Sequence, residues 1–248
     1  MEGDSAAGAV AGVRSVQYQA VLPMQGKPLN ALKAKATKVH ANPLFSQLSI
    51  ALGVPMIDAV KAALTQIDPT QIGPTQDDPT QDDPTQVAAS QAATTEPGTG
   101  LFPTLWSEQL ANLRFARINL LFEPDADGIH CGALMLMFFW RWMRPLLASG
   151  RIHMIRAPLF EMTAHLPDGE ILLAHPDSVV QCNSVKALWL DMNAAQIKIH
   201  HYRGLGSINA DVLARTCVDP ASRQSTGIGL ATAQSAIGAF SPKASLRI

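Results

Sequence analysis

Charged residues, cysteines and long apolar runs are all scarce in this sequence. Only 16% of its 248 residues are charged, and only 3 are cysteine. The most apolar stretch is interrupted by Arg141, Arg144 and Pro145, so it falls short of the ~20 apolar residues that a membrane-spanning helix needs. Met1–Leu22 lacks the basic start and apolar core of a secretory signal. We therefore expect a protein with no membrane partner.

The three cysteines, Cys131, Cys182 and Cys217, are odd in number and show no Cys-x-x-Cys spacing. This pattern argues against a disulfide framework and against a zinc site. It is typical of reduced thiols in the cytoplasm, where we expect the protein to reside. With 47% apolar residues, the chain can bury one sizeable core or two small ones.

The net charge of −1 hides an uneven distribution. No acidic residue occurs between Ser5 and Ile57, whereas the same segment holds a group of cations. These cations are Arg14, Lys27, Lys33, Lys35 and Lys38. A cationic segment of this kind can bind the phosphates of a nucleic acid. The alternative is an ordinary solvated helix face, because the last two lysines lie about one helical turn apart.

The middle of the chain is a low-complexity segment. Pro-Thr-Gln recurs at a fixed spacing from Pro69 to Gln86, with pairs of aspartates between the later repeats. Frequent proline forbids a helix, and few apolar side chains are available to offset the entropy of the chain. We expect residues 58–112 to form an extended, disordered insert.

The most informative motif is an acidic box, formed by Glu123, Asp125 and Asp127. An apolar strand, Leu120–Glu123, leads into it. Because side chains two apart on a strand point the same way, we expect the three carboxylates to crowd together and to bind a hard cation such as Mg²⁺. The apolar residues Cys131–Trp140 then predict a buried helix. The alternative is a polar turn that ends a strand.

Helix and strand patterns alternate through the second half of the chain, as in an α/β protein. The predicted helices are Gly128–Leu147, Asp177–Met192 and Asn209–Cys217, and the predicted strands are Arg151–Ile155, Phe160–Leu166, Glu170–Ala174 and Ile197–His201. Pro167-Asp168-Gly169 separates two of these strands and is typical of a hairpin turn. Ser225–Ile248 shows no clear period.

Several ordered segments resemble the Toprim region in the B subunits of bacterial DNA gyrase and topoisomerase IV, which are type IIA DNA topoisomerases. Glu2–Gly8 is similar to the signature E-G-D-S-A-G-G, and Gln19–Asn30 to Q-A-I-L-P-L-R-G-K-I-L-N. Leu113–Trp142 resembles the acidic box of that family with its flanking strand and helix. Ile199–Gly206 resembles I-Q-R-Y-K-G-L-G, and Asp219–Arg223 resembles D-P-E-T-R.

The resemblance implies a Toprim α/β fold, which is a Rossmann-like parallel sheet with flanking helices. The insert interrupts this fold, and a small C-terminal extension follows it. The implied divisions are residues 1–57 and 113–175 for the two parts of the Toprim domain, 176–223 for a C-terminal tail motif of the family, and 224–248 for an irregular tail.

The function that the resemblance implies is one portion of an ATP-dependent type II topoisomerase that cleaves and religates double-stranded DNA. It implies Glu2 as catalytic general acid/base, and Mg²⁺ held by Glu2, Glu123, Asp125 and Asp127 beside the reacting phosphate. The implied DNA-binding residues are Lys27, Lys33, Lys35, Lys38, His130 and Arg203. The implied partners are DNA, an A subunit that carries the nucleophilic tyrosine, and a separate ATPase half. The chain is therefore not expected to be active alone.

Departures from the family pattern favour an alternative, a catalytically inactive remnant or DNA-binding interaction protein that keeps the Toprim fold. Glu123 stands where the family has aspartate, and Gln25 replaces a basic residue. For His130, the alternative is a structural role, which is commoner for a lone histidine on a helix. Because the family has an apolar strand before the glutamate, we also expect Met1 to be an internal valine codon read as a start, with the gene continuing upstream.

Overall fold

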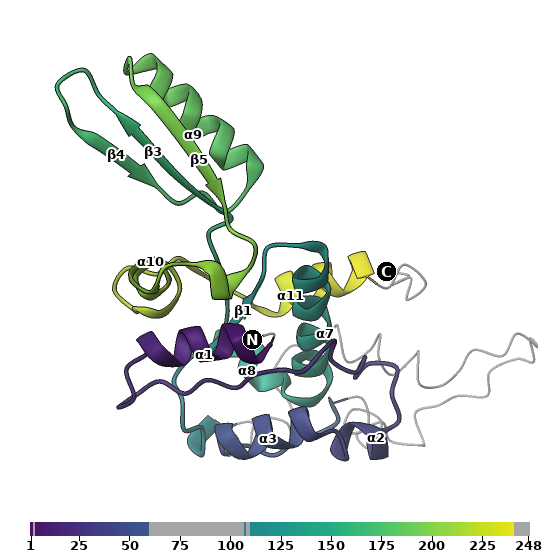
Figure 1. Cartoon of the computed structure of the whole chain (residues 1–248). Coiled ribbons are helices and arrows are strands. Elements are labelled where there is room, and N and C mark those ends of the chain that lie inside the picture. The colour runs from purple at the N-terminus through teal and green to yellow at the C-terminus, as the bar shows by residue number, and fades with distance from the viewer. Residues whose placement is uncertain (2, 60–106, 108–109, 241–248) are drawn as a thin grey trace, which may run out of the picture. The chain divides into compact units, whose positions relative to one another are not determined.

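The computed structural model describes residues 1, 3–59, 107 and 110–240. The predicted insert, residues 58–112, lies almost entirely outside these described residues, so its disorder stays a prediction. The described part combines helices and strands (Figure 1), which confirms the predicted α/β fold class. No described helix is long and apolar enough to cross a membrane.

The chain forms two compact units, each assembled from three separate stretches. Unit 1 comprises Met1–Pro28, Asn119–Gly132 and His153–Gly227, and unit 2 comprises Leu29–Ile118, Ala133–Ile152 and Ile228–Ile248. Neither unit is continuous in sequence, because the chain passes between them several times. The domain divisions implied by the resemblance stay predictions.

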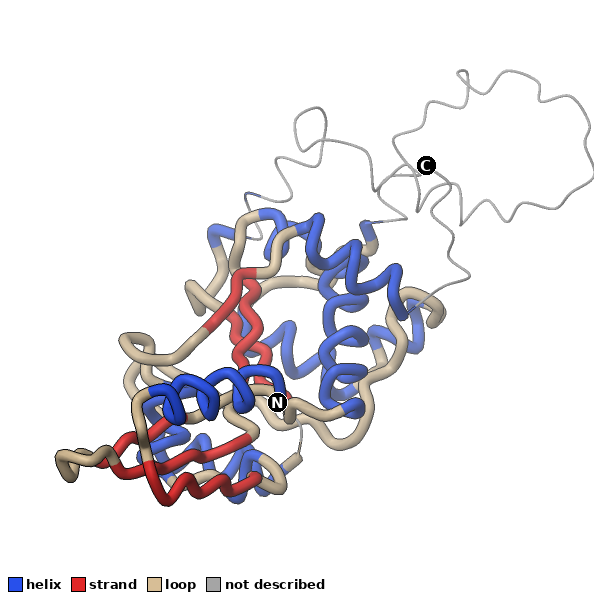
Figure 2. The backbone as a smooth tube through the Cα atoms, turned by 90° about the horizontal axis from the view of Figure 1, so that it is seen from above, coloured by secondary structure: helices blue, strands red, loops and turns tan. Residues whose placement is uncertain are grey.

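A three-stranded sheet with the order β1-β2-β6 lies in unit 1, except for the first residue of β1 and of β2. Its strands are β1 (Ile118–Phe122), β2 (Ile152–Arg156) and β6 (Ser225–Gly227), drawn in red with the other strands in Figure 2. β2 and β6 are antiparallel. Nearly all of β1 is apolar and buried, and its last residue immediately precedes the acidic box.

Helices pack against this sheet through one hydrophobic cluster of unit 1. The helical elements are α1 (Asp4–Val13), the turn η2 (Leu205–Ser207), α10 (Ala210–Leu213) and the π-type turn η3 (Ala214–Val218). Val10, Leu205 and Leu213 pack in this cluster together with Leu121 of β1 and Ile155 of β2. The start of the chain and the segment after residue 201 are thereby placed beside the end of β1.

A second sheet of unit 1 has the order β4-β3-β5 and is antiparallel throughout. It is formed by β3 (Phe160–His165), β4 (Ile171–Ala174) and β5 (Ala195–His201), with α9 (Val179–Asp191) packed on one face. Figure 1 draws these elements in green. The structure confirms the predicted hairpin, and Gly169 supplies its positive φ of 92°, which glycine adopts at little cost.

The elements of unit 2 are helical in its described part, apart from Ile118 and Ile152, the first residues of β1 and β2. It contains α2 (Ala36–His40), α3 (Pro43–Leu52), α8 (Arg144–Ala148), α11 (Leu230–Phe240) and most of α7 (Ala126–Trp142). Phe45 stacks on Phe138 with ring centroids 4.1 Å apart, and Arg141 forms an ion pair with Asp58 at 2.8 Å. The structure confirms that the apolar stretch of α7 is a buried helix.

Two helix predictions differ from the structure, and one helix was not predicted. The helix predicted over 128–147 is divided into α7 and α8 at Met143, because Pro145 has no amide hydrogen to continue the helix. The helix predicted over 209–217 is α10 followed by η3. In 225–248, where the sequence showed no period, the structure contains β6 and α11. α11 buries only Ala233 and Ile237, which is too few apolar positions to show a period.

Candidate functional site

Segments that are far apart in sequence meet at the end of β1, and all of them belong to unit 1. They are the acidic box, Lys27 and the turn Arg203–Gly206, which we call the RGLG turn. The start of α1 joins them, because a Cβ on Gly206 would lie only 2.8 Å from Ser5 Oγ. The structure therefore brings together the main segments that carry the resemblance.

Glu123 does not lie on β1, because the strand ends at Phe122. The expected alternation of Glu123, Asp125 and Asp127 along a strand is therefore wrong; the last two belong to the turn and first residues of α7. The Glu123 side chain crosses to the RGLG turn, where its Oε1 accepts a hydrogen bond from Leu205 N at 3.1 Å.

Asp125 caps the start of α7. Its Oδ1 accepts a hydrogen bond from Gly128 N at 2.7 Å, and its main-chain oxygen accepts one from Ile129 N. An acidic side chain at this position satisfies an amide that has no partner within the helix, and it also interacts favourably with the helix dipole. This contact matches the alternative of a polar turn that ends a strand.

Asp127 lies in the first turn of α7 and points into solvent, with 68% of its side chain exposed. Its Oδ1 is 2.8 Å from Lys27 Nζ. The hydrogen bond and charge of Lys27 lower the pKa of Asp127 below its ordinary value. The cation nearest to the acidic box is thus supplied by the chain itself, from the segment that the resemblance associates with DNA.

Glu2 lies outside the described residues, so its catalytic and metal-binding roles stay predictions. Its neighbours in sequence are held by main-chain hydrogen bonds, from Gly3 N to Met24 O at 2.9 Å and from Met24 N to Met1 O at 2.7 Å. The first residues of the chain therefore run beside residues 22–24, next to Lys27 in sequence.

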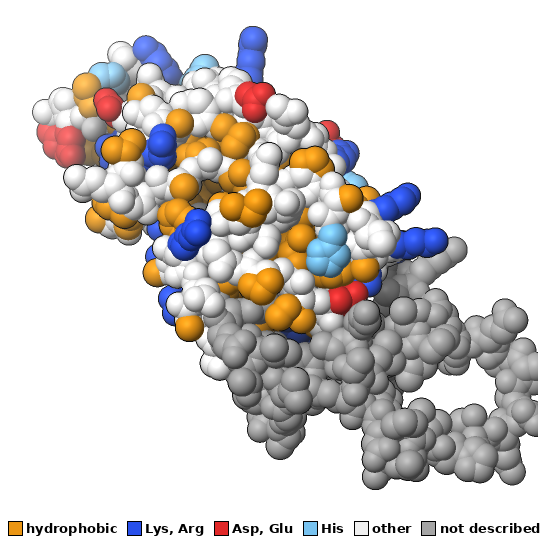
Figure 3. Space-filling model, turned by 90° about the horizontal axis from the view of Figure 1, so that it is seen from below, with side chains coloured by type: hydrophobic (Ala, Val, Ile, Leu, Met, Phe, Trp, Pro, Cys, Tyr) orange, Lys and Arg blue, Asp and Glu red, His pale blue; other side chains and the backbone are white. Residues whose placement is uncertain are grey.

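The cations predicted to bind DNA fall in both units. Lys27, His130 and Arg203 belong to unit 1, and the first and third are exposed. The other three, Lys33, Lys35 and Lys38, are exposed and belong to unit 2. Figure 3 shows lysine and arginine side chains standing singly on the face in view, with apolar side chains between them.

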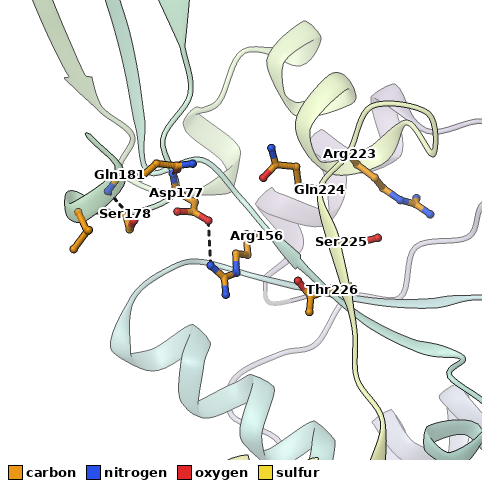
Figure 4. Close-up of a pocket in the computed structure, with 9 residues that line it drawn as sticks. Arg156, Asp177, Ser178, Gln181, Arg223, Gln224, Ser225 and Thr226 are labelled. Atoms are coloured by element: carbon orange, nitrogen blue, oxygen red, sulfur yellow. Dashed lines mark hydrogen bonds and ion pairs between the residues drawn. The ribbon is translucent and has the colours of Figure 1, made fainter. Parts of the chain in front are cut away.

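A cavity of about 750 Å³ lies elsewhere in unit 1 and shares no residue with the acidic box. Its lining is polar except for Val180: Arg156, Asp177, Ser178, Val180, Gln181, Arg223, Gln224, Ser225 and Thr226. Figure 4 shows the Arg156 guanidinium and the Asp177 carboxylate pointing toward each other, 3.5 Å apart. No motif in the sequence links the scattered residues of its lining, so the cavity could not be predicted from the sequence.

A partly buried cluster of polar side chains also could not be predicted from the sequence. The Tyr202 hydroxyl donates a hydrogen bond of 2.6 Å to Glu161 Oε2, and His175 Nε2 lies 3.7 Å from the same oxygen. Burial raises the pKa of Tyr202 and lowers the pKa of His175. The hydroxyl of Tyr202 is therefore held inside the protein as a hydrogen-bond donor to a carboxylate.

No protein-family model matches the chain. It is, however, similar to the B subunit of DNA gyrase from Thermotoga maritima, with 26% identity over 236 residues, which cover 95% of this chain and 28% of that protein. The gyrase B protein of Halalkalibacterium halodurans is 28% identical over 90% of this chain and 26% of its own length. The B subunit of DNA topoisomerase 4 from Pseudomonas aeruginosa is 23% identical over 90% of this chain.

The chain spans about a quarter of the length of these relatives. The similarity covers nearly all of its own sequence, including the acidic box and the RGLG turn. Along nearly its whole length the chain is thus similar to one part of these B subunits, which is consistent with a diverged gyrase B-like domain.

Proposed function

We propose that the chain serves as the Toprim portion in the B subunit of a type II DNA topoisomerase, acting on DNA together with an A subunit. One observation carries this proposal: the acidic box, Lys27 and the RGLG turn, separated in sequence, meet in one place. A diverged chain could keep sequence similarity to its relatives after these segments had moved apart. In this chain, the acidic box still contacts both Lys27 and the RGLG turn.

The cations around the acidic box support a DNA-binding role. Lys27 is exposed beside Asp127, and Arg203 is exposed at the start of the RGLG turn. Exposed lysine and arginine bind nucleic-acid phosphates, and each phosphate contact releases counterions from the DNA. As the resemblance implies, cleavage would require the nucleophilic tyrosine of an A subunit.

The described acidic residues do not form a magnesium site as they stand. Carboxylate oxygens are the ligands that Mg²⁺ takes in proteins. However, no three histidine, cysteine or acidic side chains among the described residues lie close enough together to hold a metal. One oxygen of Glu123 binds Leu205 N, one of Asp125 binds Gly128 N, and one of Asp127 binds Lys27. The proposal therefore includes no step through Mg²⁺.

The same contacts favour a second candidate function, a DNA-binding domain that no longer supports cleavage. Each described acid of the box has a partner within the protein that accounts for its position without a metal ion. The two candidates share DNA binding and differ only in the reaction. An assay of double-strand cleavage by this chain, combined with an A subunit and a separate ATPase half, distinguishes the two candidates.

The proposal is tested by DNA binding followed by reconstitution. Binding of the full chain to duplex DNA should weaken steeply with salt, and Arg203→Gln should reduce the affinity and the salt slope. Lys198→Gln is the matched control, because Lys198 is a cation on β5, outside the site. With a gyrase A subunit and a separate ATPase half added, double-strand cleavage supports the topoisomerase role. Salt-dependent binding without cleavage supports the second candidate, and absence of DNA binding contradicts both.

A further inference from the structure

Glu123 connects two segments that lie 82 residues apart in sequence, the acidic box and the RGLG turn. Its Oε1 accepts a hydrogen bond from Leu205 N, and Leu205 itself is 1% exposed. A Cβ on Gly204 would lie only 2.5 Å from the same Oε1. The carboxylate therefore rests directly on the main chain of the turn.

The main chain fixes where the Glu123 carboxylate can go. Pro124 restricts the backbone immediately after it. A Cβ on Gly128 would overlap the main-chain oxygen of Glu123, so the start of α7 packs closely against this residue. Asp125 adds the hydrogen bond that caps α7. The Glu123 side chain thus leaves from a constrained loop, which favours a fixed contact at its other end.

The structure assigns Glu123 to a positioning role: we propose that its carboxylate holds the RGLG turn against the acidic box and does not serve as a metal ligand. A hydrogen bond from an amide to an ionised acceptor is stronger than one between neutral groups. If this acceptor is removed, the buried Leu205 amide is left without a partner, which is costly. That this contact also supports DNA binding rests on the proposed function.

The side-chain length of glutamate matters for this contact. An aspartate at position 123, the residue that the resemblance leads one to expect, is one methylene shorter and would fall about 1.5 Å short of Leu205 N. The replacement of the family's aspartate by Glu123 is therefore what makes this contact possible, because the longer side chain reaches the turn. Gly204 has an extended φ of 163°, so it is the close approach of the carboxylate that requires glycine there.

The turn held in this way carries Arg203. Ser207 Oγ accepts a hydrogen bond from Arg203 N at 3.0 Å and donates one to Gly204 O at 2.7 Å. With Leu205 N anchored by Glu123, each of the first three residues of the turn has a hydrogen bond to its main chain. Release of Glu123 should therefore loosen Arg203 and weaken any contact that it makes with DNA.

Three substitutions at position 123 separate the positioning role from metal ligation. Glu123→Gln keeps the length and an acceptor oxygen, so the Leu205 amide should stay protected from hydrogen exchange and the Tm should change little. Glu123→Asp and Glu123→Ala should expose the Leu205 amide and lower the Tm by about 3–8 °C. If Glu123 were a metal ligand, the opposite would hold: Glu123→Asp would preserve metal binding and Glu123→Gln would not.

Mn²⁺ titration, followed by water relaxation, gives an independent readout. The positioning role predicts that wild type and Glu123→Gln bind Mn²⁺ within about twofold of each other, or that neither binds it. A loss of about tenfold or more in Glu123→Gln, which is a typical effect of weakening a metal site, would overturn the inference. So would rapid exchange of the Leu205 amide in the wild-type chain.

A double-mutant cycle tests the contact with Gly204. Gly204→Ala should displace the carboxylate and cause the same loss of Tm and of Leu205 protection as Glu123→Ala. The double variant should lose no more than either single variant, because both remove one interaction. Gly8→Ala is the matched control, since a Cβ on Gly8 meets nothing within 4 Å. Additive losses would contradict a direct contact.

DNA affinity distinguishes failure of this inference from failure of the proposed function. If the wild-type chain binds DNA, Glu123→Asp should lower the DNA affinity, at most by as much as Arg203→Gln does. Glu123→Gln should keep the affinity of the wild type. Weaker binding in Glu123→Gln but not in Glu123→Asp would contradict the positioning role while DNA binding stands. If no variant binds DNA, the proposed function fails, and the exchange of the Leu205 amide still decides the role of Glu123.

Discussion

Two carboxylates of unit 1 reach the same short segment, Tyr202–Leu205, in different surroundings. Glu161 accepts a hydrogen bond from the hydroxyl of Tyr202, which is 5% exposed and packs in the hydrophobic cluster of unit 1. Glu123 accepts one from the main chain of Leu205, beside the exposed acidic box. The segment is thus held at the side chain of Tyr202 by Glu161 and at the backbone of Leu205 by Glu123.

Burial makes the difference between these two regions. Around Glu161, burial raises the pKa of Tyr202 and lowers the pKa of His175. In the acidic box, the pKa of Asp127 is lowered by a hydrogen bond with Lys27, in full contact with solvent. Polar contacts act more strongly where water is excluded. Substitutions near Glu161 should therefore change stability, and substitutions in the exposed pair of Lys27 and Asp127 should mainly change binding.

The largest effect is expected at Tyr202. Tyr202→Ala removes a large side chain from the hydrophobic cluster of unit 1 and should lower the free energy of unfolding by about 3–5 kcal/mol. Tyr202→Phe keeps the ring and removes only the hydrogen bond to Glu161, so we expect a loss of about 1–3 kcal/mol. Urea unfolding followed by circular dichroism measures both losses.

Tyr18→Phe is the control for the tyrosine substitutions, because Tyr18 is 61% exposed and should tolerate the change. Glu161→Gln, combined with Tyr202→Phe, should lose little more than Tyr202→Phe alone if the two groups act through one hydrogen bond. Equal stability of wild type and Tyr202→Phe would show that the buried contact contributes nothing, and the contrast between the two regions would disappear.

Much of the fold could be predicted from local sequence. The apolar stretch Cys131–Trp140 has no polar face to expose, so a buried helix follows from it. Pro167-Asp168-Gly169 between two apolar stretches is a turn by its chemistry, and the hairpin is present. α11 was missed because most of its residues are small and only two are buried, which leaves no hydrophobic pattern to detect.

The separate segments of the site could be predicted from the sequence, but the contacts between them could not. The acidic box and the RGLG turn stand out in sequence, but nothing local indicates that Glu123 reaches Leu205. The strand pattern failed at Glu123 because Pro124 and the cap from Asp125 start a turn and then a helix. Contacts between distant segments depend on packing of the whole unit, and the resemblance alone suggested that these segments belong together.

A smaller effect is expected at His175, as a dependence of stability on pH. Burial favours neutral His175 and lowers its pKa from the ordinary value of 6.5, although Glu161 opposes this shift. The unfolded chain therefore takes up a proton at a higher pH than the folded chain does. The stabilisation is fully present above about pH 6.5 and is lost as the pH falls toward the lower pKa of the folded state.

His175→Gln removes this titration, so its Tm should fall less than that of wild type between about pH 7 and pH 5. His165→Gln is the control, because His165 is exposed at the end of β3 in the same sheet. A series of thermal melts across this range measures the slopes. If His175→Gln and wild type keep the same slope, burial of His175 does not govern the acid sensitivity of unit 1.

The smallest effect on stability is expected in the exposed pair of Lys27 and Asp127. Lys27→Gln should hardly change the Tm, because an ion pair in contact with water contributes little and is screened by salt. Since pairing lowers the pKa of Asp127 from 3.8, any stabilisation is present above that pH and is lost as the pH falls through the lower pKa of the folded state.

On DNA, however, the two partners of this pair should act in opposite directions. Lys27→Gln removes a cation and should weaken binding, whereas Asp127→Asn removes an anion beside that cation and should strengthen binding to phosphates. Filter binding at low salt, without divalent ions and then with Mg²⁺, measures both. If Asp127→Asn weakens binding only when Mg²⁺ is present, Asp127 bridges to DNA through a metal. Stronger binding in both conditions shows that Lys27 is the cation that DNA meets at the acidic box.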